Sequence, residues 1–305
     1  MKGVNRLNEK VMVTNSTYHN TLAITRALAK DGYQVYVSGN KKRKFGQAQV
    51  SRYCKKRLYY TRPKENTKEF ILNIKELIEK NNIDVLLPIG LDTGIAVSKY
   101  REKYLDDIVS IPFPHYETIV KAHDKANALK LASSLDIPIP QTHYLKDNEN
   151  IEDIADKMNY PLVLKTRKGA AANGVFYAKN KNNLLNIFNK IEKNKKENII
   201  HDNTKPMLQE FVKGRIHDVC CIFNDGEPVA FLTQERLKTT PYWGGSGVVN
   251  RTTNIKILKD YSSKLLHYLN WQGVAQIAFK YDPESDKFKL MEINPKFWGT
   301  TALSI

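Results

Sequence analysis

The chain has 305 residues and a formal charge of +16 at neutral pH. This length supports a large buried core divided among two or three lobes. No apolar run reaches the roughly 18–20 residues that span a bilayer, and residues 1–10 lack the apolar core of a signal peptide, so no membrane association is expected. Three cysteines without metal-ligand spacing indicate a reducing cytoplasm: Cys54, Cys220 and Cys221.

Short basic runs account for part of the positive charge. They lie at 41–44, 55–57 and 193–196, and one interpretation is that they contact nucleic acid. The runs occupy separate segments and lack the interleaved aromatic residues of a stacking platform. We favour solvated loops over a nucleic-acid partner, and the excess charge also suits anionic small molecules.

Strand and helix signals alternate along the first third of the chain. Apolar strands are predicted at 11–14, 35–37 and 85–88, and helices at 22–28, 70–78 and 93–104, the second one capped by Thr67. This alternation predicts a parallel sheet covered on both faces over roughly 10–112. No Gly-x-Gly-x-x-Gly follows the first strand, which argues against a nicotinamide site. Two prolines near residue 113 predict a domain boundary.

Antiparallel elements are predicted farther along. After a helix at 124–135, an apolar strand ends in Lys165, and a buried cation there needs an anionic partner. Residues 168–175 predict a loop of small side chains that lets backbone N–H groups approach an anion, although a plain hairpin turn is the alternative. Strands at 218–223 and 228–233 predict a hairpin, and 255–269 predicts a core helix. Residues 190–205 are assigned only a flexible connection.

The segment 234–247 is predicted as a loop on the substrate side. Arg236 and Lys238 can bind a carboxylate, and the Gly-Gly-Ser-Gly stretch at 244–247 can cradle an anion through its N–H groups. A mobile surface loop with solvated basic residues is an equally good interpretation.

Residues 290–294 form the most informative strand. Side chains alternate along a strand, so Glu292 and Asn294 share one face while Met291 and Ile293 take the other. Two oxygen donors at a strand end suit a hard cation such as Mg²⁺, which one or two protein oxygens hold together with nucleotide phosphates. The alternative is a half-buried strand whose polar side chains face water.

The string Glu-Ile-Asn-Pro-Lys-Phe-Trp-Gly at 292–299 resembles the metal-binding signature that ends an ATP-grasp domain, in the carbamoyl-phosphate-synthase-like carboxylate-amine ligase branch. The strand ending in Lys165 and the segment 208–211 match two further motifs in the family's order. The resemblance implies an α/β pre-ATP-grasp domain at 1–113 with a parallel sheet, followed by a two-lobed α+β ATP-grasp domain at 114–305, with lobes at 114–209 and 210–305. Because relatives usually continue past this point, we expect the chain to be a C-terminally truncated fragment.

The resemblance also implies roles for individual residues. Phosphate contacts fall on Lys125 and Lys165, and on the loop that contains Gly169 and Gly174, although relatives carry more glycine there. The adenine contacts fall on Glu210, Phe211 and Val212. The ribose contact falls on Asp218, which taken alone is equally well read as a surface-strand carboxylate. The metal ligands are Glu292 and Asn294. Lys296, Arg236 and Lys238 are expected on the reacting carboxylate.

Two departures from the family weaken the expected site. Ala278 stands where relatives place an acidic metal ligand, and Lys296 stands where they place arginine, so the bidentate fork is lost. If the hairpin at 282–287 pairs Ala278 with Glu292, the same register puts Gln276 opposite Asn294, where its carbonyl can bind the metal in part or simply hydrogen-bond Asn294. We therefore expect weak binding of Mg²⁺, or of Mn²⁺ in its place.

The activity implied by the resemblance is an ATP-dependent ligase. It would phosphorylate a small carboxylate and let an amine or other nucleophile displace the phosphate, and it would release ADP. A homodimer is compatible with this expectation. The alternatives are an ATP-binding protein that has weakened catalysis and serves a partner, and, with less support, a nucleic-acid-binding protein.

Overall fold

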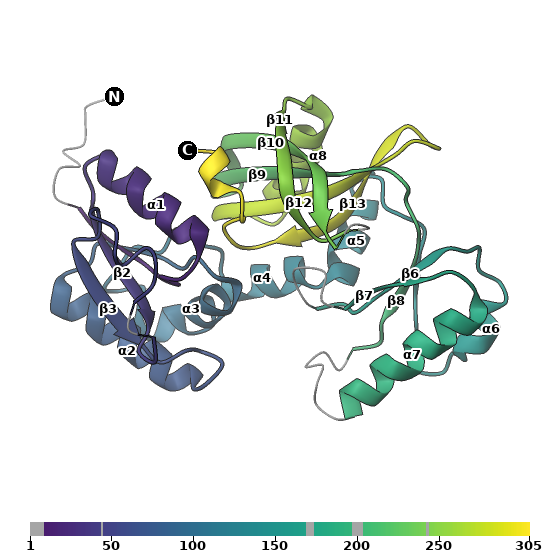
Figure 1. Cartoon of the computed structure of the whole chain (residues 1–305), viewed down its shortest axis with the longest axis horizontal. Coiled ribbons are helices and arrows are strands. Elements are labelled where there is room, and N and C mark those ends of the chain that lie inside the picture. The colour runs from purple at the N-terminus through teal and green to yellow at the C-terminus, as the bar shows by residue number, and fades with distance from the viewer. Residues whose placement is uncertain (1–8, 44, 169–173, 197–203, 242–243) are drawn as a thin grey trace.

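The computed structural model describes residues 9–305 except 44, 169–173, 197–203 and 242–243. It contains a parallel sheet in the order β3-β2-β1-β4, an antiparallel sheet in the order β5-β8-β6-β7, and an antiparallel sheet in the order β11-β10-β9-β12-β13. Figure 1 shows them as three successive bodies, with the large antiparallel sheet in the middle. The predicted mixture of parallel α/β and antiparallel α+β structure is confirmed. No described helix is long and apolar enough to cross a membrane.

The parallel sheet comes first in the chain. Its strands are β1 (Lys10–Val13), β2 (Gln34–Asn40), β3 (Lys56–Tyr60) and β4 (Val85–Leu87), and its helices are α1 (His19–Lys30), α2 (Thr67–Asn81) and α3 (Leu91–Tyr104). The parallel pairing is as predicted. Two details of the prediction are wrong. Asn66, not Thr67, caps α2, because its side chain accepts the N–H of Glu69. The basic run at 55–57, predicted as a solvated loop, largely belongs to strand β3. In this strand Leu58 and Tyr60 are buried and the residue between them is exposed.

Two helices, α4 (Tyr116–His123) and α5 (Lys125–Ser134), precede the small antiparallel sheet in the chain and pack against β13 of the large sheet. The small sheet carries helices on one face, and its elements are β5 (Thr142–Tyr144), α6 (Ile151–Ala155), β6 (Leu162–Lys165), β7 (Val175–Ala178), α7 (Lys181–Lys196) and β8 (Met207–Glu210). Leu162, Leu164 and Leu208 pack in a core with α6 and α7, so alternate residues of the strands face the opposite way. Because α7 continues to Lys196, the expected flexible connection is wrong for 190–196, while 197–203 lie outside the described residues.

The large antiparallel sheet also has one apolar face. It consists of β9 (Ile216–Asn224), β10 (Glu227–Thr240), β11 (Ser246–Thr253), β12 (Gly273–Asp282) and β13 (Lys287–Asn294), with α8 (Lys256–Tyr268) between β11 and β12. Val219, Ile277 and Phe279 pack with α5 and α8. The predicted hairpin and core helix are confirmed, but residues 234–240 belong to β10 rather than to a loop.

The segment after β13 joins the large sheet to the parallel sheet. Trp298 packs in one core cluster with Val274 and with Phe113. The side-chain amide of Asn20 donates a hydrogen bond to the carbonyl of Phe297 over 3.4 Å. The end of the Glu-Ile-Asn-Pro strand is therefore fixed from both sides.

Candidate active site

The polar faces of the two antiparallel sheets enclose a cavity of about 290 Å³. Side chains two apart on one strand face the same way, so each sheet presents alternate residues to this cavity. The predicted site residues that line it are Lys125, Lys165, Glu210, Val212, Asp218, Arg236, Gln276, Glu292, Asn294 and Lys296.

The remaining predicted residues lie elsewhere. Lys238 is exposed on β10, and neither it nor Phe211 or Gly174 lines the cavity. Gly174 instead closes a turn: its φ is +81°, and a Cβ there would approach Thr166 Oγ1 to 2.0 Å, so glycine is required. Gly169 lies outside the described residues.

Lys165 ends strand β6 as a buried cation that is 8% exposed. Its ammonium donates to Gln209 Oε1 over 2.5 Å, and the Gln209 amide in turn donates to Thr142 Oγ1 over 2.9 Å. Burial lowers the pKa of Lys165 to about 8. A neutral amide compensates a buried charge incompletely, so this ammonium is suited to bind an anion.

Lys125 is the first residue of α5, which Asp124 caps by accepting the N–H groups of Ala126 and Asn127. The Lys125 ammonium lies 3.7 Å from Glu292 Oε2. A lysine at the start of a helix is expected to lie nearer to solvent than one at the end of a buried strand, but Lys125 is only 5% exposed and this expectation is wrong. Its position over β13 buries it as deeply as Lys165.

The metal-ligand candidates adopt the predicted register. Ala278 pairs with Glu292, and Gln276 pairs with Asn294. The Asn294 amide donates to Glu292 Oε1 over 2.9 Å. Burial raises the pKa of Glu292, but the Lys125 ammonium and the Asn294 hydrogen bond outweigh burial and lower it.

The available donors define what metal this site can hold. Within the described residues, no group of three His, Cys, Asp or Glu side chains comes together. One carboxylate and two amide oxygens remain, and they fit a Mg²⁺ that takes its other ligands from phosphates and water.

Strand β13 departs from regular alternation at Met291. Glu292 pairs with Ala278, but Leu290 already pairs with Phe279, so Met291 is an extra residue in a β-bulge. Met291 therefore lines the cavity together with Glu292, and its sulfur lies 3.8 Å from Lys165 Nζ. The prediction that Met291 faces away from Glu292 is wrong.

Arg236 and Asp218 form a buried ion pair. Arg236 Nε and Nη2 donate to the two oxygens of Asp218 over 2.8 and 2.6 Å, and Gln234 donates to the same carboxylate over 3.1 Å. Arg236 Nη1 also donates to the carbonyl of Gly245. Arg236 thus holds the glycine stretch against β9 and does not present the free guanidinium that a carboxylate-binding role would need.

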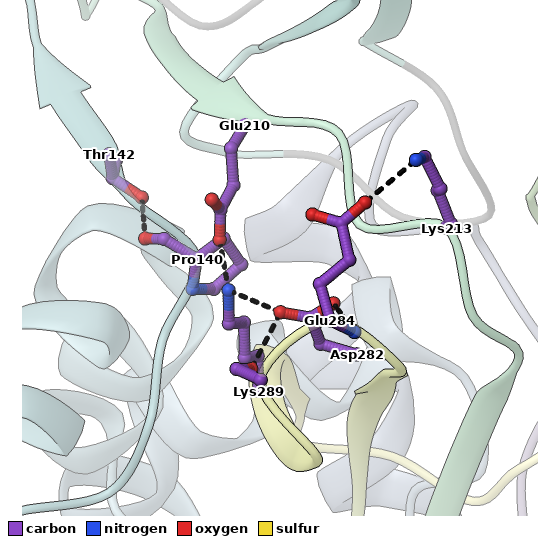
Figure 2. A network of polar contacts seen from close by, with 8 residues as sticks. Pro140, Thr142, Glu210, Lys213, Asp282, Glu284 and Lys289 are labelled. Carbon is purple, nitrogen blue, oxygen red and sulfur yellow. Dashed lines mark hydrogen bonds and ion pairs between the residues drawn. The ribbon is translucent and has the colours of Figure 1, made fainter.

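The Glu210 side chain forms an ion pair with Lys289. Figure 2 shows Lys289 between Glu210 and Asp282, with its ammonium 2.8 Å from Asp282 Oδ2 and ion-paired to Glu210. The nearby Lys213–Glu284 pair spans 2.7 Å on the surface. This network attaches the end of β8 to the β12–β13 hairpin.

The cavity lining includes a set of apolar and aromatic side chains from the two sheets: Val163, Val175, Tyr177, Val212 and Ile216. Lys280, which sequence reasoning missed, also lines the cavity. The signal was present in the sequence, since Gln276, Ala278 and Lys280 are two apart on one strand and share a face.

Comparison with known families explains this arrangement. Residues 122–246 match the family model of the RimK-like ATP-grasp domain. The chain is also 24% identical over 240 residues to the carbamoyl phosphate synthase large chain of Methanobrevibacter smithii, a match that covers 76% of this chain. The family-model match thus indicates a RimK-like ATP-grasp domain at residues 122–246. The chain spans 22% of the length of the carbamoyl phosphate synthase chain.

Solved structures share the fold of this chain. Biotin carboxylase from Campylobacter jejuni, in complex with β,γ-ATP, superposes with a TM-score of 0.77 at 15% identity, over 95% of this chain and 65% of that one. The L-amino acid ligase of Bacillus licheniformis gives 0.72 at 13% identity, over 96% of this chain and 68% of that one. The likeness extends over the parallel sheet as well as the ATP-grasp sheets.

Proposed function

We propose that this ATP-grasp chain is an ATP-dependent carboxylate-amine ligase that acts through an acyl phosphate. The observation that carries the proposal is the single cavity in which Lys125 and Lys165 lie with Glu292 and Asn294. The two buried ammonium groups can bind the oxygens of a polyphosphate, and the carboxylate beside them can bind the metal ion that accompanies it.

The proposed reaction uses positioning and charge. A carboxylate oxygen attacks the γ-phosphorus, the bond to the β-bridging oxygen breaks, and ADP leaves. An amine or other nucleophile then attacks the acyl carbon and displaces phosphate. Lys125 and Lys165 would neutralise the phosphate oxygens, and Lys296 would hold the carboxylate. Mg²⁺, or Mn²⁺, bound by Glu292, Asn294 and Gln276 would add Lewis-acid stabilisation of the transferring group.

The remaining predicted contacts stay proposals. The backbone at 210–212 would bind adenine, and the loop of Gly169 and Gly174 would cover the phosphates. Asp218 would reach the ribose only by sharing its oxygens with Arg236. A homodimer and a cytoplasmic location are also proposed, the latter supported by three free cysteines.

A second function is favoured by one specific observation. Ala278 lies between Asp218 and Glu292 in the sheet, where a third carboxylate would complete a stronger metal site. The absence of a carboxylate at position 278 is what we would expect of a protein that binds ATP, hydrolyses it slowly and serves a partner. Nucleic-acid binding has no comparable support, since two of the basic runs are structured as β3 and α7.

A substrate screen tests the proposal. Amino acids, dipeptides and other small carboxylates, each combined with candidate amines, are incubated with ATP and Mg²⁺, and ADP and phosphate are measured. Substrate-dependent ADP release supports the ligase. ATP binding with no ADP release for any pair supports the weakened ATP-binding protein instead.

A further inference from the structure

A short segment, 211–215, connects β8 of the small antiparallel sheet to β9 of the large one. Its far end is held to strand β12, because the Tyr281 N–H donates to the Arg215 carbonyl over 3.1 Å. Gly214 lies so close to β12 that a Cβ there would approach the Tyr281 carbonyl oxygen to 1.8 Å, so glycine is required. The connecting segment therefore runs directly against the β12–β13 hairpin.

The near end of this segment is held by Lys289 of β13. The Lys289 side chain is 14% exposed, and its ammonium ion-pairs with Glu210 of β8 and lies 2.8 Å from Asp282 Oδ2 of β12 (Figure 2). Asp282 is itself fixed, because it accepts the Ser285 hydroxyl over 2.7 Å and the Glu284 N–H over 3.1 Å. Lys289 thus ties the end of β8 to a rigid turn of the hairpin.

This ion-pair network acts on the cavity from outside it. Neither Lys289 nor Asp282 lines the cavity, whereas Glu210 and Val212 do. Removing the ammonium would take no contact away from a ligand. It would leave the Glu210 and Asp282 carboxylates facing each other without a compensating charge, and their repulsion would move the end of β8 away from the hairpin.

The phosphate end of the cavity does not depend on this network. The ion-pair partners of Lys289 in the described chain lie on β8 and β12, whereas Lys125 begins α5 and Lys165 ends β6. Glu210 pairs with Leu162, at the opposite end of β6 from Lys165. A shift of the chain at Glu210 therefore leaves the two phosphate-binding lysines in place.

We propose that Lys289 is a positioning residue that holds the backbone at 210–212 where a nucleotide base binds, so that it strengthens binding of the nucleoside and not of the phosphates. This inference rests on the proposed function, since it takes the cavity as a nucleotide site. A general role in folding would instead weaken binding of every part of the nucleotide alike.

The test compares two ligands that share a triphosphate and differ in the nucleoside: a non-hydrolysable ATP analogue and inorganic tripolyphosphate, each with Mg²⁺. Titration calorimetry measures the dissociation constants for the wild type, Lys289→Met, Lys289→Arg and Lys213→Met. Arginine keeps a cation for both carboxylates. Lys213→Met is the matched control, because the Lys213 side chain is 67% exposed and pairs with Glu284 of the same hairpin, and an exposed pair contributes little. Circular dichroism checks that each variant is folded.

We expect Lys289→Met to weaken binding of the ATP analogue roughly tenfold, about the loss of one hydrogen bond to the base, and to change tripolyphosphate binding less than about twofold. Lys289→Arg should recover most of the loss, and Lys213→Met should change neither constant. Unchanged affinity for the analogue, or equal weakening of both ligands, in Lys289→Met would overturn the proposal.

A second variant keeps the proposal testable if Lys289→Met does not fold. Asp282→Asn removes the charge of the other carboxylate outside the cavity, and it should weaken the ATP analogue selectively but by a smaller factor. The absence of a selective loss in Asp282→Asn would then overturn the proposal. A wild type that binds neither ligand would overturn the proposed function, and this inference with it.

Discussion

Replacing Lys165 by Ala should remove most of the nucleotide affinity. The ammonium is 8% exposed and its described hydrogen-bond partners are the neutral Gln209 amide and the Met291 sulfur, so salt screens it little. Losing one hydrogen bond from a charged group to phosphate costs about 1.5–3 kcal/mol. That loss weakens the dissociation constant roughly 10- to 150-fold. Titration calorimetry with a non-hydrolysable ATP analogue measures it.

Two further variants make this experiment decisive. Lys125→Ala should weaken binding to a similar extent, because Lys125 is 5% exposed and solvent screens its charge little. Lys179→Ala, at an exposed lysine beyond the end of β7, should leave affinity unchanged. Wild-type affinity in Lys165→Ala would refute the phosphate assignment, and an effect of Lys179→Ala equal to that of Lys165→Ala would show only a general loss of positive charge.

Three other predictions address the metal site, the pH dependence and the buried ion pair. Ala278→Glu should raise Mg²⁺ affinity or ATPase activity, measured by calorimetry and ADP release, while Glu292→Ala and Asn294→Ala should remove both. A decrease in Ala278→Glu, or tight Mg²⁺ binding by the wild type, would contradict the weakened site. Because burial lowers the pKa of Lys165 and Lys280 to about 8, both are charged below that pH, and nucleotide affinity should fall as the pH rises through 8. One such lysine accounts for roughly a tenfold loss by pH 9, and a rise in affinity over this range would oppose the assignment. Arg236→Met should destabilise the fold by about 3–5 kcal/mol in thermal or urea denaturation, because it leaves the fully buried Asp218 carboxylate unpaired. Arg251→Met, which removes an exposed partner of Glu235, should cost less than about 1 kcal/mol, and equal losses would argue against this reasoning.

Local periodicity was sufficient to predict the parallel sheet and the register of the last hairpin. The pairing of Gln276 with Asn294 follows from a short turn and from alternation, both of which are properties of neighbouring residues. The common cavity of Lys165 and Glu292 was predicted from the resemblance of their two motifs to a known family, whereas strand alternation alone does not bring β6 and β13 together.

The errors involve properties that depend on distant residues. Alternation placed Met291 on the wrong face because a bulge is set by how β13 meets β12. Arg236 looked free for a substrate, but its partner Asp218 lies on the adjacent strand β9. The burial of Lys125 comes from packing of α5 on β13, and the contact of Lys280 with the Phe211 ring joins two segments that are far apart in the sequence.

The central claim is that ATP is cleaved between its β- and γ-phosphates to activate a carboxylate. Phosphorus NMR of a reaction mixture with an active substrate pair tests it most directly, because it distinguishes the two cleavage patterns. Lys125, Lys165 and the metal ligand Glu292 share one cavity suited to γ-phosphoryl transfer, so we expect ADP and inorganic phosphate in equal amounts with product. Formation of AMP and pyrophosphate would contradict the acyl-phosphate mechanism.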